Sequence, residues 1–232
     1  MSTQTLHWRG TWARVGPWRG HDDVALITVS TDTPATPDLV GYCLTRLRAL
    51  GYRAVVTGAL SPAGALAFVD AGFTVRERLH LLAHDTGAPL PPPGHPTRRA
   101  RRSEQPAVLA LDALCFEPPW RIDSRALRDT LVATPAVRFR VVDDPDVYLA
   151  GYAIAGRAGT HGYLQRLAVH PAVHRRGLGR TLVADALGWM ARHGVERTLV
   201  NTQLHNDAAL RLYEACGFRR LPVGLCVFGR SL

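Results

Sequence analysis

The stretch VHRRGLGRTL, residues 173–182, places three arginines around the triplet Gly177-Leu178-Gly179. The residues before it, GYLQRLAVHP, are apolar enough for a buried strand, and the residues after it, TLVADALGWMARHG, have the apolar spacing of a helix. The glycines are therefore predicted to lie at a strand-to-helix junction. Backbone N–H groups at a helix start are unpaired and carry a positive partial charge, and glycine lets a ligand approach them. We expect a phosphate-bearing ligand there.

The net charge of the chain is only a weak indicator of nucleic-acid binding. The net charge is +9, and every basic residue is arginine, because the 232 residues include no lysine. With abundant alanine, glycine and proline, this composition is typical of a GC-biased coding sequence, which accounts for part of the charge. No nucleic-acid reading motif accompanies it, so nucleic-acid binding is not expected. The 47% hydrophobic content is sufficient for a folded core.

The sequence has no pattern that is typical of a secreted or a membrane-spanning protein. No apolar run has the length of a membrane span, and the first residues lack the charged start and apolar stretch of a secretory signal. The cysteines are scattered in apolar surroundings without metal-ligand spacing. We therefore expect a cytoplasmic protein with reduced thiols, no bound metal and no membrane contact. The four cysteines are Cys43, Cys115, Cys216 and Cys226.

The proline-rich stretch GAPLPPPGHP, residues 87–96, is the clearest break in the chain. Proline clusters favour an extended linker. This linker predicts an N-terminal unit over residues 1–86 and a second unit over residues 97–232.

The two predicted units look like copies of one pattern. Each closes with a helix, a Gly-Phe pair and a strand, and Gly72 and Gly217 stand where a helix needs left-handed backbone to end. The N-terminal counterpart of the glycine junction is TDTPATPD, residues 31–38, whose prolines remove backbone donors. The N-terminal unit is therefore expected to be a smaller, degenerate half-copy.

The second unit is predicted to have a mixed α/β fold, with a central mixed sheet flanked by helices. Its first strand contains four arginines, which can belong to a strand rather than to a binding patch. Helices are expected over residues 106–115, 124–133, 177–193 and 206–216, and strands over residues 98–102, 137–142, 147–155, 162–169, 197–203 and 221–228.

Two common phosphate loops do not fit the junction. A P-loop needs a lysine, and a dinucleotide fingerprint needs a third glycine where Leu182 stands. The segments LAVHPAVHRRGLGRTL, residues 167–182, and NTQLHNDAALRLYEACGF, residues 201–218, resemble the GNAT superfamily of acetyltransferases instead. The loop pattern of that family is Gln/Arg-x-x-Gly-x-Gly/Ala, and this chain has His174 at the first position. The resemblance covers residues 97–232 and implies acetyl-CoA as co-substrate.

The resemblance also implies which residues bind the coenzyme. Backbone N–H groups of the loop would hold the pyrophosphate, and Arg175, Arg176 or Arg180 would meet the remaining phosphate. The backbone of two strand residues would pair with the pantetheine arm, and Asn206 would bond the arm or cap its helix. The implied set is Leu167, Val169, His174, Arg175, Arg176, Gly177, Leu178, Gly179, Arg180, Thr181 and Asn206.

Tyr213 is the residue that we expect to be catalytic. Attack of an amine on a thioester expels a thiolate, and a phenol with a pKa of ~10 can donate a proton to a thiolate whose thiol pKa is ~8.5. Asn206, Leu210 and Tyr213 share one helical face, which in the family lies against the coenzyme. A purely structural role is the alternative. The N-terminal copy has Phe68 at the matching position, which keeps the ring and lacks the proton.

The general base is not identified by the sequence. Many members of the family place a glutamate on one of the two central strands, but these positions are Gln165 and Asn201 here. The candidates are His161, His205, a chain of water molecules, or an amine that is already deprotonated.

The segment LDALCFEPPW, residues 111–120, is similar to the substrate-side entry of the N-terminal-amine acetyltransferases that modify ribosomal proteins. The similarity rests on Cys115, Phe116, Pro119 and Trp120. Aromatic packing is the alternative interpretation. A duplicated arrangement with one silent half is also similar to mycothiol synthase, although the first unit is shorter than a full domain.

The combined hypothesis is an acyl-CoA-dependent N-acyltransferase that moves an acetyl group by direct transfer to a primary amine, on a small molecule or a protein N-terminus. A non-catalytic, regulatory CoA-binding module is the first alternative, because the glutamates are missing. A basic RNA- or ribosome-associated protein is the second. The oligomeric state, including a homodimer, is left open.

Overall fold

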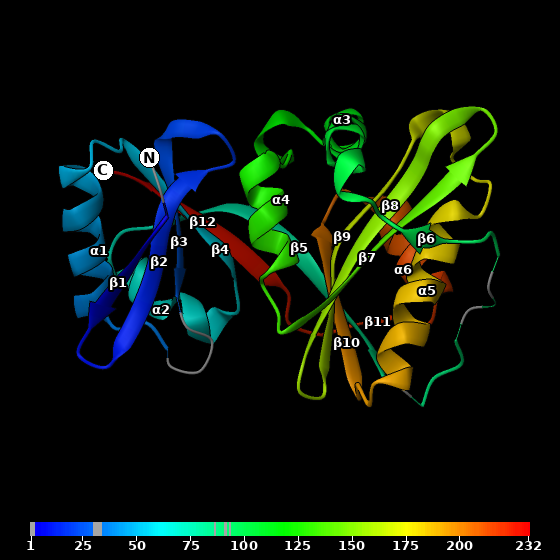
Figure 1. The fold of residues 1–232 in the computed structure, drawn as a ribbon. Helices are drawn as coiled ribbons and strands as arrows, with labels where there is room; N and C mark the ends of the chain where they lie inside the picture. Colours follow the sequence, from blue (N-terminus) through cyan, green and yellow to red (C-terminus); the bar gives the residue numbers. More distant parts are fainter. Residues whose placement is uncertain (1–2, 30–33, 86, 91, 93) are drawn as a thin grey trace. The chain divides into compact units, whose positions relative to one another are not determined.

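The computed structural model describes residues 3–29, 34–85, 87–90, 92 and 94–232 (Figure 1). The chain divides into two compact units. Unit 1 consists of residues 1–80 and 222–232, and unit 2 consists of residues 81–221.

Unit 1 is a sheet with two helices. Its strands follow the order β1-β2-β3-β4-β12-β5, and β3 and β4 are the parallel pair, joined by the helix α1. The core lies between this sheet and the buried faces of α1 and α2. The elements are β1 (Gln4–Trp8), β2 (Thr11–Trp18), β3 (His21–Val29), α1 (Pro37–Ala49), β4 (Ala54–Leu60), α2 (Pro62–Asp70), β5 (Thr74–Asp85) and β12 (Leu225–Ser231).

Unit 2 is a mixed sheet with helices on both faces, in the order β5-β10-β9-β8-β7-β6, with β11 paired to β5. One core cluster packs under α5 and α6, and another packs under α3 and α4 (Figure 1). The elements are β6 (Arg98–Arg99), η1 (Arg102–Glu104), α3 (Gln105–Cys115), η2 (Pro118–Trp120), α4 (Ser124–Leu131), β7 (Ala136–Asp144), β8 (Val147–Ala158), β9 (His161–Val169), η3 (Pro171–Val173), α5 (Leu178–Arg192), β10 (Arg197–Gln203), α6 (Asp207–Ala215) and β11 (Arg219–Arg220).

Each unit is completed by a strand from the other half of the chain. The last strand, β12, pairs with β4 and with the first part of β5 in unit 1. The second part of β5, which belongs to unit 2, pairs with β11 at Leu82 and Ala83. The compact units therefore differ from the division expected at residues 87–96, because residues 81–96 group with unit 2 and the final strand groups with unit 1. The pairing of β12 with β4 and β5 joins segments that are far apart in sequence, so no local sequence pattern indicates it. A proline cluster indicates only a local break in the chain. The linker itself stays a prediction.

The same local hydrogen bonds recur in the two units. In unit 1 the N–H of Phe73 donates to the C=O of Phe68 at 3.0 Å, and in unit 2 the N–H of Phe218 donates to the C=O of Tyr213 at 3.0 Å. The glycine within each turn, the position expected to need left-handed backbone, has a φ of +79° or +89°. The repeated helix and Gly-Phe turn are therefore confirmed at the backbone level. The strands that follow differ: β5 is long, whereas the turn in unit 2 leads only into β11, and the strand expected over residues 221–228 begins at Leu225 and runs to Ser231. Of the N-terminal junction TDTPATPD, residues 31–33 lie outside the described residues.

The arginine-rich segment at the start of unit 2 departs from the expected strand. Only Arg98 and Arg99 pair with β7, and the chain then turns into the short helix η1. The expected strand over residues 98–102 was therefore too long. Arg98 is held by Glu104 of η1 at 2.7 Å and by Asp143 of β7 at 2.6 Å, so it links the short helix to the end of the paired segment.

Candidate active site

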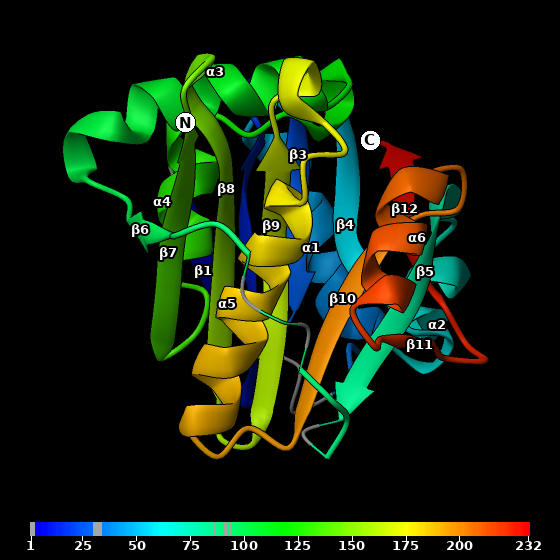
Figure 2. The same cartoon turned by 90° about the vertical axis from the view of Figure 1, so that its right-hand side faces the viewer.

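The two central strands of unit 2 separate along their length. The parallel ladder joins Arg197, Thr198 and Leu199 of β10 to residues 161–163 of β9. Both strands continue beyond this ladder, and Figure 2 shows them diverging. From residue 164 onward, the edge of β9 that faces β10 is therefore without a ladder partner.

The backbone groups of Leu167 and Val169 face this gap. The N–H of His170 donates to Ala150 of β8 at 2.7 Å, which makes residue 170 a hydrogen-bonded position of the antiparallel ladder. Such positions alternate, so Leu167 and Val169 are non-hydrogen-bonded positions. Their N–H and C=O groups consequently point away from β8 and toward β10. This is the placement that pairing with an extended amide-containing ligand requires.

The junction after β9 forms the start of helix α5. Arg175 and Gly177 both have left-handed backbone, with φ of +63° and +84°. The first helical bond runs from the N–H of Thr181 to the C=O of Gly177 at 3.0 Å. Within the described parts of the chain, the six N–H groups of residues 175–180 have no backbone acceptor. They form the row of donors, at the positive end of a helix, that an anion would use.

Gly179 also has a packing role. A Cβ atom there would lie 3.1 Å from the Cδ2 of Leu212 on α6 and 3.6 Å from the Cγ2 of Val169 on β9. The glycine therefore lets α6 and the end of β9 pack directly against the first turn of α5.

The three loop arginines are not equivalent. Arg176 forms ion pairs with Asp144 at 3.2 Å and with Asp146 at 2.6 Å, in the turn between β7 and β8. Its carbonyl oxygen also lies 2.9 Å from the Nε2 of His95. Arg175 and Arg180 are exposed and form no ion pair with the described residues. They are the two arginines whose guanidinium groups remain available to a phosphate.

Three other expected binding residues have partners within unit 2. The hydroxyl of Thr181 is buried and accepts the N–H of His95 at 3.1 Å. Leu178 is buried in the core, so only its backbone reaches the loop surface. The Nε2 of His174 lies 2.8 Å from the carbonyl oxygen of Val169, which also accepts the Cys115 thiol at 3.2 Å.

Asn206 is the N-cap of α6. Its Oδ1 accepts the N–H of Ala209 at 3.1 Å, so the capping alternative considered for this residue is realised. The Nδ2 group remains as a donor at the open end of β10, beside the gap.

Tyr213 lies on α6 within the core cluster below α5 and is 6% exposed. Its ring is 5.8 Å from that of Phe218. Burial raises the pKa of Tyr213, while the positive charge of Arg166 lowers it. The phenol is therefore protonated at neutral pH. Among the described residues, none hydrogen-bonds its hydroxyl, which leaves this proton for a ligand.

A buried cluster on the other side of β9 was missed by the sequence analysis. Asp112 of α3 is fully buried and accepts Arg166 at 2.8 and 2.9 Å, Tyr152 at 2.6 Å and the N–H of Ile122 at 2.9 Å. A charged residue in the apolar stretch of α3, and another in the apolar stretch of β9, were the signals that could have predicted this pair.

Arg166 joins this cluster to the CFEPPW segment. Its guanidinium lies over the ring of Phe116, 3.5 Å from the centroid, and donates to the carbonyl oxygen of Trp120 at 2.8 Å. Phe116 also packs against the core cluster under α3 and α4, as the aromatic packing interpretation expects. Through Arg166 the segment is fixed to β9, the strand that borders the gap.

Gln165 and Asn201 occupy the two strand positions at which a glutamate could have served as the general base. Gln165 is an extra residue in β9 opposite β8, a β-bulge, because Arg166 faces Ile154 while Leu164 faces Ala155. Its Oε1 is buried and has no hydrogen-bond partner among the described residues. Asn201 is exposed on β10.

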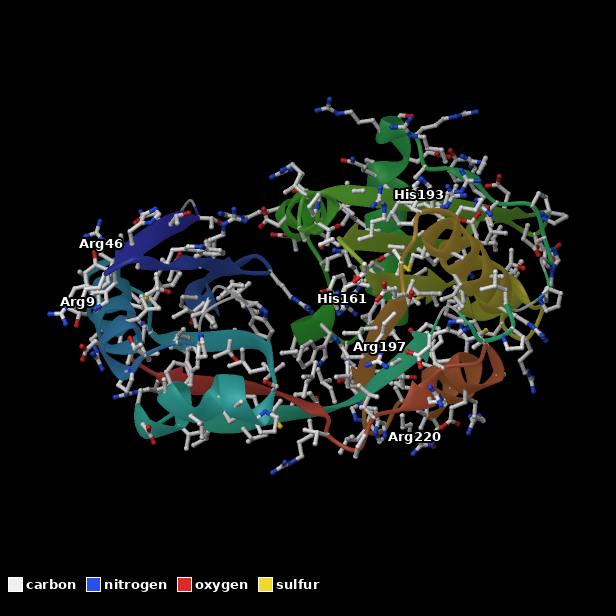
Figure 3. The ribbon with its side chains drawn as sticks, turned by 90° about the horizontal axis from the view of Figure 1, so that it is seen from below. Arg9, Arg46, His161, His193, Arg197 and Arg220 are labelled. Carbon is white, nitrogen blue, oxygen red and sulfur yellow. The ribbon has the colours of Figure 1, made fainter. Side chains whose placement is uncertain are left out.

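The two histidines considered as bases lie in different places. His161 pairs with Arg197 at the closed end of the two strands (Figure 3), eight residues before Val169. At ~3.3 Å per residue this is ~26 Å along β9 from Val169 and the glycine loop. His205 is exposed in the turn before α6, at the open end.

The described residues form neither a metal-ligand cluster nor a membrane-spanning helix. No group of three or more His, Cys, Asp or Glu side chains is arranged to hold a metal ion. No helix in the described ranges has both the length and the apolar character needed to cross a membrane.

Residues 106–218 match the family model of the GNAT acetyltransferases. The chain is 34% identical, over 199 residues, to a mycothiol acetyltransferase of Salinispora arenicola, an alignment that covers 75% of this chain and 64% of the relative. It is 37% identical over 60 residues to the N-alpha-acetyltransferase 30 of Saccharomyces cerevisiae, covering 26% of this chain and 34% of that protein. The fold is similar to that of a tandem GNAT protein from the clavulanic acid biosynthesis pathway, with a TM-score of 0.67, 15% identity and coverage of 98% of this chain and 81% of that one. The glycine loop, the diverging strands and these similarities together establish that residues 106–218 form a GNAT acetyltransferase domain.

Proposed function

We propose that unit 2 transfers an acetyl group from acetyl-CoA directly to a primary amine. The observation that carries this proposal is the gap between β9 and β10. The gap has outward-facing backbone groups at Leu167 and Val169, and a row of free N–H donors follows at residues 175–180. The protonated Tyr213 lies on α6, the helix that follows β10. Because the chain spans 64% of the length of the mycothiol acetyltransferase that it resembles, this activity is inferred from the geometry of the site.

The pyrophosphate would be bound by the N–H groups at the start of α5. The cradle fits an anion because Gly177 provides a left-handed turn without a side chain. Arg175 and Arg180 would meet the remaining phosphate of the coenzyme, since Arg176 is held by Asp144 and Asp146.

The pantetheine arm would lie along β9 and take the place of a neighbouring strand. The carbonyl oxygen of Val169 is already bonded to Cys115 and lies next to His174, which leaves the N–H of Val169 and both backbone groups of Leu167 for the arm. The Nδ2 of Asn206 offers a further donor on the opposite side of the gap.

The reaction requires one proton donor and one proton acceptor. The amine nitrogen attacks the thioester carbonyl, the new C–N bond forms, and the C–S bond breaks. Tyr213 donates its proton to the departing sulfur. The proton lost by the amine passes through water and returns to the phenol, so no net proton is consumed. Because Gln165 and Asn201 cannot accept this proton, we assign the acceptor role to water. His205, exposed in the turn before α6, is the alternative proton acceptor.

The acceptor would approach from the wall formed by the CFEPPW segment. Arg166 fixes this wall through Phe116 and Trp120. The relatives include a mycothiol acetyltransferase and an N-alpha-acetyltransferase, which supports testing both small-molecule and protein N-terminal amines as acceptors.

Unit 1 is proposed to be inactive. Phe68 stands at the position of Tyr213 and packs edge-on against Phe73, with ring centroids 5.2 Å apart. It provides a buried ring and no proton.

The experiment that tests the proposal is release of free CoA thiol from acetyl-CoA with a panel of amines. The panel contains peptides with free or blocked N-termini and small amino thiols with free or blocked amines. Thiol release that requires the free amine is expected. Coenzyme binding without thiol release for any amine would favour the regulatory module, a reading that the absence of a carboxylate at residues 165 and 201 supports.

A further inference from the structure

The margin of the unit 2 sheet formed by β7 and β6 is separated from the gap by β8 and β9. The strand β6 covers the outer edge of β7 only at Val141 and Arg140, and Ala100 then adds one bond from its N–H to the C=O of Phe139 at 3.2 Å. The chain leaves the edge there. Figure 2 shows β7 at this margin, with the short β6 beside it. Within the described ranges, residues 136–138 of β7 therefore border no strand on this side.

The uncovered edge has unpaired backbone groups. Phe139 is a hydrogen-bonded position of the β6 side, so Val137, two residues earlier, also directs its N–H and C=O outward. Val137 faces Gly156 of β8 as a non-hydrogen-bonded pair, which is consistent with that direction. In the described structure neither backbone group of Val137 has a hydrogen-bond partner. One donor and one acceptor are therefore presented side by side, as in the edge of an incomplete sheet.

Residues of this edge, Val137 among them, line a pocket of ≈460 Å³, which is called the groove below. Leu131 of α4 and Phe139 line one side, and Trp189 of α5 lines the other. Trp189 is 8% exposed and Phe139 packs edge-on against Tyr152, so the walls are fixed by the cores on both faces of the sheet. Because its walls are fixed, the groove can accept side chains of an added strand without rearrangement of either core.

Among the described residues that line this groove, arginine is the only charged type. Arg138 and Arg140 lie at its base, where they share the single carboxylate of Asp185, at 2.6 and 3.6 Å. The remaining three, Arg99, Arg101 and Arg102, are exposed at the rim, and none of them forms an ion pair with the described residues. One carboxylate for five guanidinium groups leaves a strong positive charge.

We propose that this groove binds an extended, acidic peptide segment of a partner protein, which adds to the edge of β7 as a further strand. Backbone pairing at Val137 would supply register, and acidic side chains would meet the rim arginines. A peptide fits better than a phosphate compound or a nucleic acid because the edge offers an acceptor as well as a donor, and a phosphate can pair only with the donor. The site is separate from the acetyl-transfer gap, since β8 and β9 lie between them.

The test uses the full chain and a fluorescein-labelled octapeptide of alternating Glu and Val, measured by anisotropy at physiological salt. Two further peptides serve as comparisons: one with Lys in place of Glu, and one with alternate backbone nitrogens methylated. Arg99→Glu with Arg102→Glu reverses the rim charge. Arg46→Glu with Arg48→Glu, on the exposed face of α1 in unit 1, is the control of equal charge change (Arg46 is labelled in Figure 3).

Saturable binding of the acidic peptide is expected, weakened at least about tenfold by backbone methylation and by the rim reversal, and unchanged by the control pair. Val137→Pro, which removes the outward N–H without touching the pairing with β8, is expected to weaken binding to a similar degree. Equal binding of the methylated peptide, stronger binding of a single-stranded oligonucleotide of equal charge, or no binding at all would overturn the proposal. The last result would mean that the arginines only protect the edge against self-association.

Discussion

The Nε2 of His174 lies 2.8 Å from the carbonyl oxygen of Val169 and thereby ties the glycine loop to the strand that borders the gap. The thiol of Cys115 reaches the same oxygen at 3.2 Å from α3. Three elements thus meet at one backbone carbonyl, which holds the edge of β9 and the start of α5 in a fixed relation. A ligand with a phosphate at one end and amides along its length would meet both parts at once.

Tyr213→Phe should abolish most turnover and leave coenzyme binding intact. Proton donation by a positioned group contributes about 10²–10⁴ in rate, and the ring that packs against Phe218 remains. Steady-state thiol release and the acetyl-CoA dissociation constant would be measured together. Tyr148→Phe, at a tyrosine that is 74% exposed, is the matched control. A Tyr213→Phe variant with wild-type turnover would show that the phenol is only a core residue.

Gly177→Val should weaken coenzyme binding more than its loss of folding stability alone would. A β-branched residue at a φ of +84° costs about 1–2 kcal/mol, and it also places a side chain among the free N–H groups. Gly194→Val is the control, because Gly194 has a φ of +70° at the far end of α5, away from the loop. Urea unfolding should show similar destabilisation of both variants, while ligand-induced thermal stabilisation should be lost only in Gly177→Val. Loss in both variants would point to a global effect.

Arg175→Gln with Arg180→Gln should remove discrimination between acetyl-CoA and its analogue without the 3′-phosphate. The wild type is expected to bind acetyl-CoA about tenfold more tightly than the analogue, because the two arginines are free to form charge-assisted contacts. Arg176→Gln should retain the discrimination, since its side chain is held by Asp144 and Asp146. Isothermal titration with both ligands measures this. Discrimination lost in Arg176→Gln alone would contradict the assignment.

Acid should destabilise the chain partly through Glu104. Hydrogen bonds from Arg98 lower the pKa of Glu104 from 4.5 to about 2. A carboxyl whose pKa is lower in the folded state contributes stability that is complete above the unfolded value and is lost as pH falls through the folded one. The wild type should therefore lose stability between about pH 5 and pH 2 more steeply than Glu104→Gln. Urea midpoints across this range would show it, and parallel curves for the two proteins would contradict it.

Features governed by local chemistry were predictable from the sequence. The helix α5, the strand β10 and the left-handed glycines at residues 72 and 217 follow from apolar spacing and from the rule that a helix ends on glycine. The family of the second half followed from the glycine loop and the helix that carries Tyr213.

Features that depend on long-range pairing were not predictable. The exchange that places β12 in unit 1 depends on hydrogen bonds to strands about 150 residues away in sequence. Asp112 and Arg166 each appear in the sequence as a charged residue within an apolar segment, and only the fold brings them together as an ion pair. The sequence could not show that Asp144 pairs with Arg176 and not with Arg175. The two arginines are adjacent, and the direction of each side chain depends on how the backbone turns in the loop.

Calorimetric titration of the purified chain with acetyl-CoA tests the central claim most directly. We predict one saturable site per chain with micromolar affinity, lost or at least about tenfold weaker in Gly177→Val and retained in Gly194→Val. The absence of binding to the wild type, or equal binding by the Gly177→Val variant, would show that the loop and the gap between β9 and β10 do not hold the coenzyme, and the proposed acetyl transfer would be wrong.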